Sequence, residues 1–267
     1  MAGKRQRLDL LLVERGLVPT CAEAQAHLMA GEVFVDGRRA EKPGQQARAD
    51  ADVEIRPSIR PYVSRGGEKL AGALDAFGID VSGKVALDVG SSTGGFCDCL
   101  LRRGAARVYA VDVGRGQLDW GLRGDERVVV MEGVNARNLE PGDLPEPVDL
   151  AALDLSFISL TKVLPAVLPL VREGGHLLPL IKPQFEVERG LVGKGGVVRD
   201  PRLHRDVLRR IGEFLYNSGA EVAAAAPSPL RGPKGNREFF FHAVRRTPAG
   251  PPDHLERLIE KAVDEQD

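Results

Sequence analysis

The sequence predicts an α/β protein in which a small α+β module precedes a mostly parallel sheet that is closed by an antiparallel strand. Three observations predict this fold class. Short apolar runs alternate with helical stretches between residues 85 and 181, as in a parallel sheet covered on both faces. Two later apolar runs are joined by a short Pro/Gly-rich loop, which favours an antiparallel return. The first 58 residues instead show two helical stretches and then short strands, so they form a module of their own.

Helix signals define this N-terminal module. The segment "RLDLLLVERGL" has helical spacing and ends at Gly16, and a second helix begins after Thr20 and ends at Gly31. The segment "EVFVDGRRAE" reads as a strand and a turn. Prolines and a glycine pair in "RPSIRPYVSRGG" indicate a linker. We therefore expect one domain over residues 1–59 and a linker over 60–66.

The remaining strands build the larger domain, which we place at residues 67–246. Buried runs predict parallel strands at 85–89, 107–112, 127–131, 148–153 and 176–181. The segment "AEVAAAAPSPLRGPKGNREFFFHAV" predicts two further strands with a turn between them, the second of which is the antiparallel closing strand. Residues 247–267 are expected to be a tail that carries an amphipathic helix, "PPDHLERLIEKAV".

A glycine-rich turn follows the first of these strands, in "ALDVGSSTGGFCDCL". A phosphate-binding loop needs a lysine where Phe96 stands, and the dinucleotide fingerprint needs a glycine where Ser92 stands. A tight turn from Gly90 to Gly94, with a helix beginning near Gly95, remains. Such a turn suits a ligand that lies against main chain and carries no phosphate.

An acidic residue sharpens this interpretation. Asp112 ends the next strand, 18 residues beyond Gly94, about where a ribose-binding acid follows a glycine turn. A ligand with a ribose and without a phosphate grip suggests S-adenosylmethionine. The competing explanation is a glycine turn that serves only close packing of strand against helix.

Composition excludes several classes. Lys and Arg total 37 against 38 Asp and Glu, with a net charge of -1, so any basic surface must be local. Cys21, Cys97 and Cys99 suit neither a disulfide framework nor a zinc site, and the latter two read as small buried side chains in a reducing cytoplasm. The five histidines lack ligand spacing, so no metal is expected. The longest uncharged apolar stretch, residues 163–171, is far below the ~20 residues of a membrane span.

Ordered motifs then carry a family resemblance along nearly the whole chain. The segment from Asp88 to Phe96 resembles the D-x-G-x-x-x-G-G-[FW] turn of FtsJ-like methyltransferases, with Thr93 in place of the usual proline, and the N-terminal module resembles the S4 RNA-binding domain. Together with "VSRGGEKL", "DVGRGQL", "LDLSFISL", "IKPQFE", "GGVVRDP" and "SPLRGPKGNREFF", they resemble the TlyA family of ribosomal RNA ribose 2'-O-methyltransferases, some of which are called hemolysins. The resemblance implies a Rossmann-like class I methyltransferase domain after an S4-like domain. It also implies a cytidine target.

The family's Lys-Asp-Lys-Glu tetrad falls on Lys69, Asp154, Lys182 and Glu238. Without the family, Asp154 and Lys182 each end a predicted strand, at the edge where open parallel sheets bind ligands. Glu238 begins the closing strand, so an antiparallel course brings it to the same edge; Lys69 enters only through the resemblance. A buried salt-bridge network is the competing explanation.

A ribose hydroxyl must lose its proton before it attacks a methyl group, which calls for a base poised near neutral pH. We expect Lys182 to act as that base or to stabilise the alkoxide, and Lys69 to lower its pKa and orient it. Asp154 is expected nearest the cofactor methyl group, and Glu238 is expected to anchor the set from outside.

The other site residues are expected in two groups. Asn135 and Ala136, after the third strand, are placed at the adenine edge by the resemblance, although an Asn there is also a common turn former. The S4-like module holds ten Lys and Arg against nine Asp and Glu, so RNA binding depends on how its cations cluster. The expected cofactor residues are Asp88, Gly90, Ser91, Ser92, Thr93, Gly94, Gly95, Phe96, Asp112, Val113, Asn135 and Ala136, and the expected RNA-binding residues are Lys4, Arg5, Arg7, Arg38 and Arg39.

The sequence thus predicts S-adenosylmethionine-dependent ribose methylation of RNA within ribosomal subunits, in the cytoplasm and without a membrane or an obligate protein partner. Two other classes compete with it. One is an assembly factor that binds RNA without turnover, against which the intact tetrad argues. The other is a membrane-lytic hemolysin, for which the chain offers no span and no long basic amphipathic helix.

Overall fold

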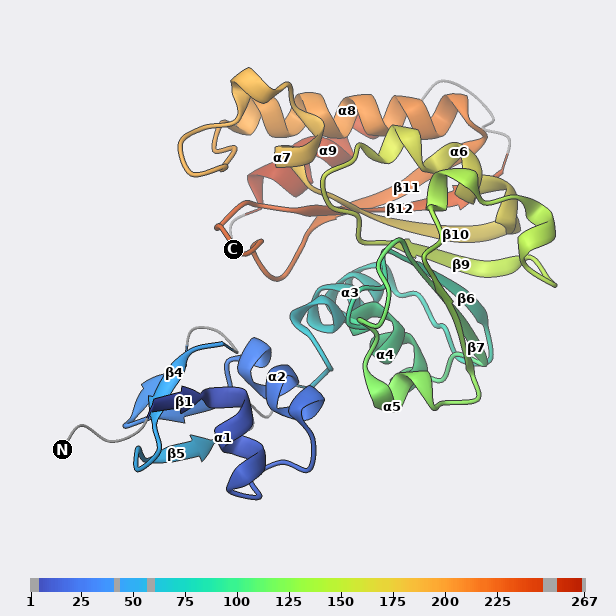
Figure 1. Cartoon of the computed structure of the whole chain (residues 1–267). Coiled ribbons are helices and arrows are strands. Elements are labelled where there is room, and N and C mark those ends of the chain that lie inside the picture. Colours follow the sequence, from blue (N-terminus) through green and yellow to red (C-terminus); the bar gives the residue numbers. More distant parts are fainter. Residues whose placement is uncertain (1–4, 41–43, 57–60, 247–253, 266–267) are drawn as a thin grey trace. The chain divides into compact units, whose positions relative to one another are not determined.

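The computed structural model describes residues 5–40, 44–56, 61–246 and 254–265. It divides into two compact units, Met1–Arg60 and Pro61–Asp267, which are described separately (Figure 1). Within the described residues, no helix is long and apolar enough to span a membrane.

The smaller unit packs two helices with short antiparallel strands around one apolar core. Thr20 begins the second helix by accepting a hydrogen bond from the Glu23 N–H, and Gly31 ends it with a φ of 70°. A short first strand, Arg5–Arg7, was not predicted, and the expected helical segment begins at Arg7, the last residue of this strand. The elements are β1 Arg5–Arg7, α1 Leu8–Glu14, α2 Cys21–Ala30, β2 Val33–Val35, β3 Arg38–Arg39, β4 Gln46–Arg48 and β5 Val53–Ile55, with β1 paired to β4, and β2 between β3 and β5.

The larger unit is built on a seven-stranded sheet in the order β11-β12-β10-β9-β6-β7-β8. The five strands from β8 to β10 are parallel, and β12 runs antiparallel between β10 and β11. The predicted fold class, a mostly parallel sheet closed by an antiparallel strand, is therefore confirmed. The strands are β6 Val85–Val89, β7 Arg107–Asp112, β8 Val128–Glu132, β9 Val148–Leu153, β10 Val171–Ile181, β11 Ala220–Pro227 and β12 Phe239–Arg245.

Two strands have boundaries that differ from those predicted. β8 begins and ends one residue later than expected. β10 begins at Val171 rather than at residue 176, because its pairing with β9 shifts register between Val171 and His176. Gly174 lies in that irregular stretch with a φ of 74°, and the glycine pair there interrupts the apolar pattern by which the strand was predicted.

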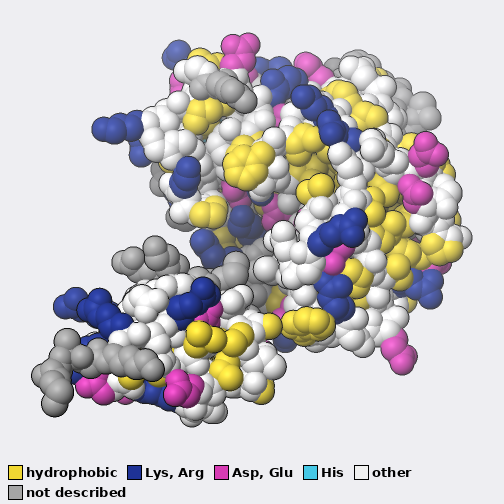
Figure 2. Space-filling model, viewed as in Figure 1, with side chains coloured by type: hydrophobic (Ala, Val, Ile, Leu, Met, Phe, Trp, Pro, Cys, Tyr) yellow, Lys and Arg dark blue, Asp and Glu magenta, His cyan; other side chains and the backbone are white. Residues whose placement is uncertain are grey.

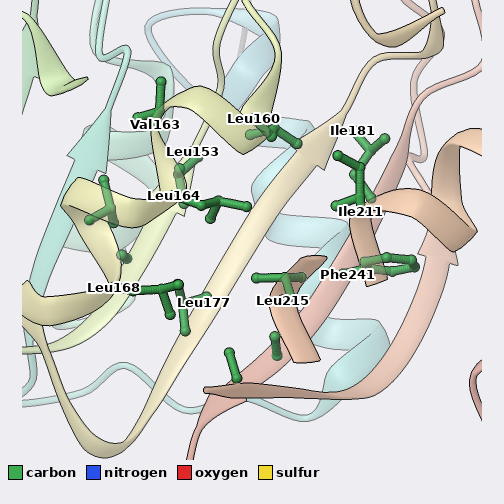
Figure 3. Close-up of a cluster of buried hydrophobic side chains, with 14 of the residues drawn as sticks. Leu153, Leu160, Val163, Leu164, Leu168, Leu177, Ile181, Ile211, Leu215 and Phe241 are labelled. Carbon is green, nitrogen blue, oxygen red and sulfur yellow. The ribbon is translucent and has the colours of Figure 1, made fainter. Parts of the chain in front are cut away.

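Helices cover both faces of this sheet (Figure 1). On one face, α3, α4 and α5 bury a cluster that includes Leu70, Leu74, Phe96 and Leu100. On the other, α6, α8 and α9 enclose the cluster drawn in Figure 3, in which Leu153 and Leu177 of the sheet contact the helical layer. The helices are α3 Arg65–Phe77, α4 Gly95–Arg102, α5 Trp120–Arg123, α6 Leu164–Val167, α7 Pro183–Glu186, α8 Pro201–Asn217 and α9 Leu255–Asp264.

Candidate active site

The glycine turn connects β6 to α4 at the carboxyl edge of the parallel strands. Gly90 has a φ of 88°, and a Cβ atom added there would lie 2.5 Å from the carbonyl oxygen of Asp154. Gly94 has a φ of 95°, and an added Cβ would lie 2.3 Å from Leu122 Cδ1. Both positions therefore need glycine for left-handed backbone and for close packing within the protein. At Gly94 this packing explains the residue without a ligand.

Asp88 lies beneath this turn, with no exposed surface. Its Oδ2 accepts a hydrogen bond of 2.9 Å from the Cys97 N–H at the start of α4, while its Oδ1 has no partner among the described residues. Burial, and then the nearby carboxylates of Asp154 and Asp112, raise the pKa of Asp88 well above its usual value. Asp88 thus holds the beginning of α4 through a hydrogen bond, and its carboxyl group favours the neutral form.

Asp112 holds the turn from the neighbouring strand. Its Oδ2 accepts from the Ser92 N–H at 2.8 Å and its Oδ1 accepts from the Gly114 N–H at 2.6 Å. Each oxygen keeps a second lone pair, so the carboxylate can also accept the hydroxyl groups of a ribose. Val113, the next residue, is 73% exposed, which leaves an apolar side chain open beside this acid.

Asn135 takes the role of a turn former. Its Oδ1 accepts hydrogen bonds of 3.2 Å from the N–H and Nε of Arg137, and it caps the short 3₁₀ helix Ala136–Asn138. This capping does not bring Asn135 into the cleft that the glycine turn borders.

A cleft of about 150 Å3 opens beside the turn, below the ~300–1,000 Å3 that is usual for small-molecule sites. Half of the expected cofactor residues line it; Asp88, Gly94, Asp112, Val113, Asn135 and Ala136 lie outside the lining. The lining residues are Ser64, Arg65, Gly66, Lys69, Gly90, Ser91, Ser92, Thr93, Gly95, Phe96, Asp154, Arg231 and Pro233.

The segment before α3 also reaches this cleft, which the sequence analysis did not foresee. Asp98 of α4 accepts a 2.9 Å hydrogen bond from the Val63 N–H, and Tyr62 packs so closely over Gly67 that a Cβ there would lie 2.3 Å from its Cγ. Ser64 then caps α3 by accepting from the Gly66 N–H. The quoted motif "VSRGGEKL" was the only signal for these residues, and it assigned no role to them.

The four tetrad residues form two ion pairs around the same cleft. Lys69 Nζ of α3 lies 2.5 Å from Glu238 Oε2, just before β12, and both side chains are almost completely buried. Gln184 adds a 3.3 Å hydrogen bond from its Nε2 to Glu238 Oε1. Lys69 is therefore held by Glu238, and no contact between the two lysines is described.

The second pair joins the ends of two neighbouring strands. Lys182 Nζ, directly after β10, lies 2.5 Å from Asp154 Oδ1, directly after β9, in an ion pair without the geometry of a directed hydrogen bond. Its Nζ also donates to Ser156 Oγ at 3.1 Å and lies 5.9 Å from the centre of the Phe185 ring. Because Asp154 is 22% exposed and lines the cleft, this pair can meet a substrate.

Among the described residues, no group of three or more His, Cys, Asp or Glu side chains is placed to hold a metal ion. Cys97 and Cys99 are buried, and burial raises the pKa of both thiols. The chemistry available at the cleft is therefore that of paired lysines and carboxylates.

The expected RNA-binding cations lie in the smaller unit on two different sheets. Arg5 and Arg7 are on β1, and Arg7 is bound to Asp9 through two hydrogen bonds of 2.7 and 3.1 Å. Arg38 and Arg39 are consecutive residues of β3, so their side chains leave opposite faces of that strand. Lys4 lies outside the described residues. On the face of this unit seen in Figure 2, basic and acidic side chains are mixed.

Each of the two units is similar to a known protein family. Residues 62–245 match the family of FtsJ-like methyltransferases, and residues 6–53 match the S4 domain. A relative from Mycobacterium tuberculosis, named 16S/23S rRNA (cytidine-2'-O)-methyltransferase TlyA, is 45% identical and covers 98% of this chain and 99% of its own length. Hemolysin A of Brachyspira hyodysenteriae is 39% identical over 89% of this chain and 99% of its own.

Solved structures show the same similarity. A Streptococcus thermophilus protein that carries the name hemolysin is 38% identical and superposes with a TM-score of 0.73, over 97% of this chain and 95% of its own. A Listeria monocytogenes structure named as an S-adenosylmethionine dependent methyltransferase shares 15% identity, with a TM-score of 0.52 over 68% of this chain and all of its own. The second likeness extends the fold of the larger unit to distant methyltransferases.

Proposed function

The chain belongs to the FtsJ-like methyltransferases, in the TlyA group that carries an S4 domain, and we propose that it methylates the ribose 2'-oxygen of a cytidine in ribosomal RNA. The observation that carries the proposal is the Lys182–Asp154 pair, which lies at the carboxyl edge of the sheet beside the glycine-turn cleft. An amine and a carboxylate in contact can manage the proton and the charge of a hydroxyl that becomes a nucleophile.

S-adenosylmethionine fits the residues beside the cleft and, when bound, supplies a methyl group made electrophilic by a sulfonium. Asp112 would hold its ribose hydroxyls, the backbone of the glycine turn would lie along its adenosine, and the exposed Val113 would contact its adenine. Asp154 would face the positive end of the molecule. Because hydrogen bonds to Asp112 already hold the turn in its conformation, binding needs little further ordering of this part of the site.

The paired charges suggest how the hydroxyl proton moves. An ammonium paired with a carboxylate cannot take up a further proton, so Lys182 would have to lose one before acting as a base. In the pair as it stands, Asp154 accepts the hydroxyl proton and Lys182 stabilises the oxygen anion. This oxygen would form its new bond to the methyl carbon as the carbon–sulfur bond breaks and its electron pair returns to sulfur, which leaves a neutral thioether. Lys69 lines the cleft, and its contact with Glu238 joins α3 to the beginning of β12.

Ribosomal RNA is the substrate class favoured by the relatives and by the S4 domain. The cations of the smaller unit, which include Arg5 and Arg38, would contribute affinity through phosphates, which is independent of sequence and sensitive to salt. We place the reaction in the cytoplasm, in keeping with three free cysteines. The name hemolysin among the relatives has no counterpart in a spanning helix within the described residues.

Methyl-labelled S-adenosylmethionine tests the proposal when the protein is incubated with separated small and large ribosomal subunits. Label should enter the RNA of at least one subunit at a rate that depends on the protein. Matched incubations with each protein-free ribosomal RNA would show whether the assembled subunit is required. Binding of the cofactor without transfer to any of these RNAs would favour the assembly factor instead.

A further inference from the structure

Glu186 is a buried carboxylate that the proposed reaction does not use. It ends α7, the single helical turn that begins directly after Lys182. Its side chain is only 2% exposed. A buried carboxylate is costly unless several donors satisfy it, so its partners indicate what it does.

Three donors from two segments of the chain reach this carboxylate. Glu186 Oε1 accepts from the Leu160 N–H at 2.8 Å, and its Oε2 accepts from Ser159 Oγ at 2.7 Å. The guanidinium of Arg210, on α8, donates to Oε2 at 3.0 Å and to the Glu186 carbonyl oxygen at 2.5 Å. Two of the three donors therefore belong to the segment that follows β9.

That segment, residues 154–160, is fastened to α7 at both of its ends, and we refer to it as the β9 loop. Lys182, immediately before α7, contacts the beginning of the loop through Asp154 at 2.5 Å and Ser156 at 3.1 Å. Glu186, at the other end of α7, binds the end of the loop at Ser159 and Leu160. The β9 loop and α7 thus form one clamp, of which the reactive pair is one end.

The middle of the β9 loop has an unfavourable backbone. Phe157 has a φ of 64°, a left-handed conformation that aromatic residues rarely adopt, and its side chain is 90% exposed. Its ring packs against that of Phe185 of α7, at 4.9 Å between centroids. Such a conformation costs about 1–3 kcal/mol and persists only where the surroundings enforce it. Here the two fastened ends are those surroundings.

We propose that Glu186 is a positioning residue, whose carboxylate holds the β9 loop against α7 and so keeps Asp154 and Ser156 in contact with Lys182. This inference rests on the proposed function of the Lys182–Asp154 pair. The contacts of Glu186 with the β9 loop are the essential ones for this role, because Arg210 is half exposed and can turn its guanidinium to water.

Glu186→Ala and Glu186→Gln separate the possibilities. The alanine variant loses both loop contacts, and we expect its single-turnover methyl transfer to fall about 10-fold or more, since misplacement by about 1 Å can cost ~10²-fold. Affinity for the cofactor should stay near wild type, because no contact between Glu186 and the cleft lining is described. The glutamine variant keeps an oxygen for the Leu160 N–H, and the Ser159 hydroxyl can accept from its amide, so it should stay within about 3-fold of wild type.

Glu256→Ala is the matched control, because Glu256 pairs with Arg209, the neighbour of Arg210 on the same helix, away from the loop. Rates are normalised to the number of cofactor-binding sites found by calorimetry. Hydrogen exchange of the Leu160 amide gives a second readout that needs no substrate. It should accelerate in Glu186→Ala and stay slow in the glutamine and control variants.

Wild-type transfer in Glu186→Ala, or a loss equal to that of Glu256→Ala, would overturn the positioning role. If the alanine variant does not fold, Ser159→Ala takes its place and should lower transfer about 3-fold with unchanged cofactor affinity; no loss would again overturn it. If wild-type protein transfers no methyl group to any ribosomal RNA, the proposed function fails by itself. The exchange of Leu160 in Glu186→Ala then decides whether the clamp exists, and slow exchange would reject it.

Discussion

The two lysine–carboxylate pairs beside the cleft use the same chemical groups in different surroundings. Glu238 is 1% exposed and also accepts from Gln184, so the carboxylate of the Lys69–Glu238 pair is enclosed by protein, while Lys69 itself lines the cleft. Asp154 is 22% exposed, lines the cleft and leaves the Lys182 contact open to a substrate. The difference assigns anchoring to the first pair and chemistry to the second, although the sequence treats the four residues as one set.

The largest effect is expected from breaking the enclosed pair. Lys69→Ala leaves the Glu238 charge buried without its partner, which costs about 3–5 kcal/mol of unfolding free energy. The double variant Lys69→Met, Glu238→Gln removes both charges and should recover most of that loss. Denaturant unfolding of the wild type and both variants measures this. An unfolding free energy of Lys69→Ala equal to wild type would contradict the anchoring role.

Breaking the accessible pair should affect turnover instead. Lys182→Ala removes the cation that stabilises the oxygen anion, and we expect kcat to fall on the order of 10²-fold or more. Cofactor affinity should change little, as calorimetry would show. Lys162→Ala, an exposed lysine of the 3₁₀ helix Leu160–Lys162, is the matched control. A wild-type kcat in Lys182→Ala would remove this residue from the mechanism.

Asp112 differs from the carboxylates of both ion pairs, because it accepts hydrogen bonds from backbone N–H groups rather than contacting a lysine. Asp112→Ala should weaken cofactor binding about 10-fold, since hydrogen bonds to a charged group contribute about 1.5–3 kcal/mol. Calorimetric titration with S-adenosylmethionine measures it. Gly94 is a poorer probe, because a side chain there would collide with Leu122 whether or not a ligand binds. Unchanged affinity in Asp112→Ala would place the ribose elsewhere.

The last effect depends on pH and concerns Asp88, whose pKa is raised mainly by burial. The folded protein keeps this proton while the unfolded chain releases it near pH 4, so the associated stability is complete below pH 4 and is lost as pH rises toward the folded-state pKa. Asp88→Asn cannot ionise. Its unfolding free energy relative to wild type should therefore rise above pH 4, by at most ~1.4 kcal/mol per pH unit. Parallel stability profiles of the two proteins would show that Asp88 is ionised in the fold.

Hydrophobic pattern and turn chemistry were enough to predict most of the sheet. The strands at 85–89, 107–112 and 148–153 were predicted to the residue, because each is a continuous buried run that ends at a polar residue or turn. β1 was missed, because three residues are too few to show a periodic pattern in the sequence. It is held by pairing with β4, a contact between distant parts of the module.

Site prediction succeeded where the topology alone gathers residues. Asp154 and Lys182 end adjacent parallel strands, so strand order places them at one edge. The pairing partners did not follow from the sequence, because they depend on side-chain directions: Lys69 binds Glu238 rather than Lys182. Glu186 escaped notice for a related reason, since a single acid in a one-turn helix carries no pattern and its donors lie in two other segments, 24 to 27 residues away along the chain.

The position of the new methyl group tests the central claim most directly. RNA methylated by the wild-type protein is hydrolysed in alkali, where a free ribose 2'-oxygen is the internal nucleophile of cleavage, and the labelled nucleoside is then identified by mass spectrometry. The account predicts one uncleaved phosphodiester in the ladder at each modified position and a 2'-O-methylated cytidine. A continuous ladder, with the label on a base, would contradict the assignment of the Lys182–Asp154 pair to a ribose hydroxyl.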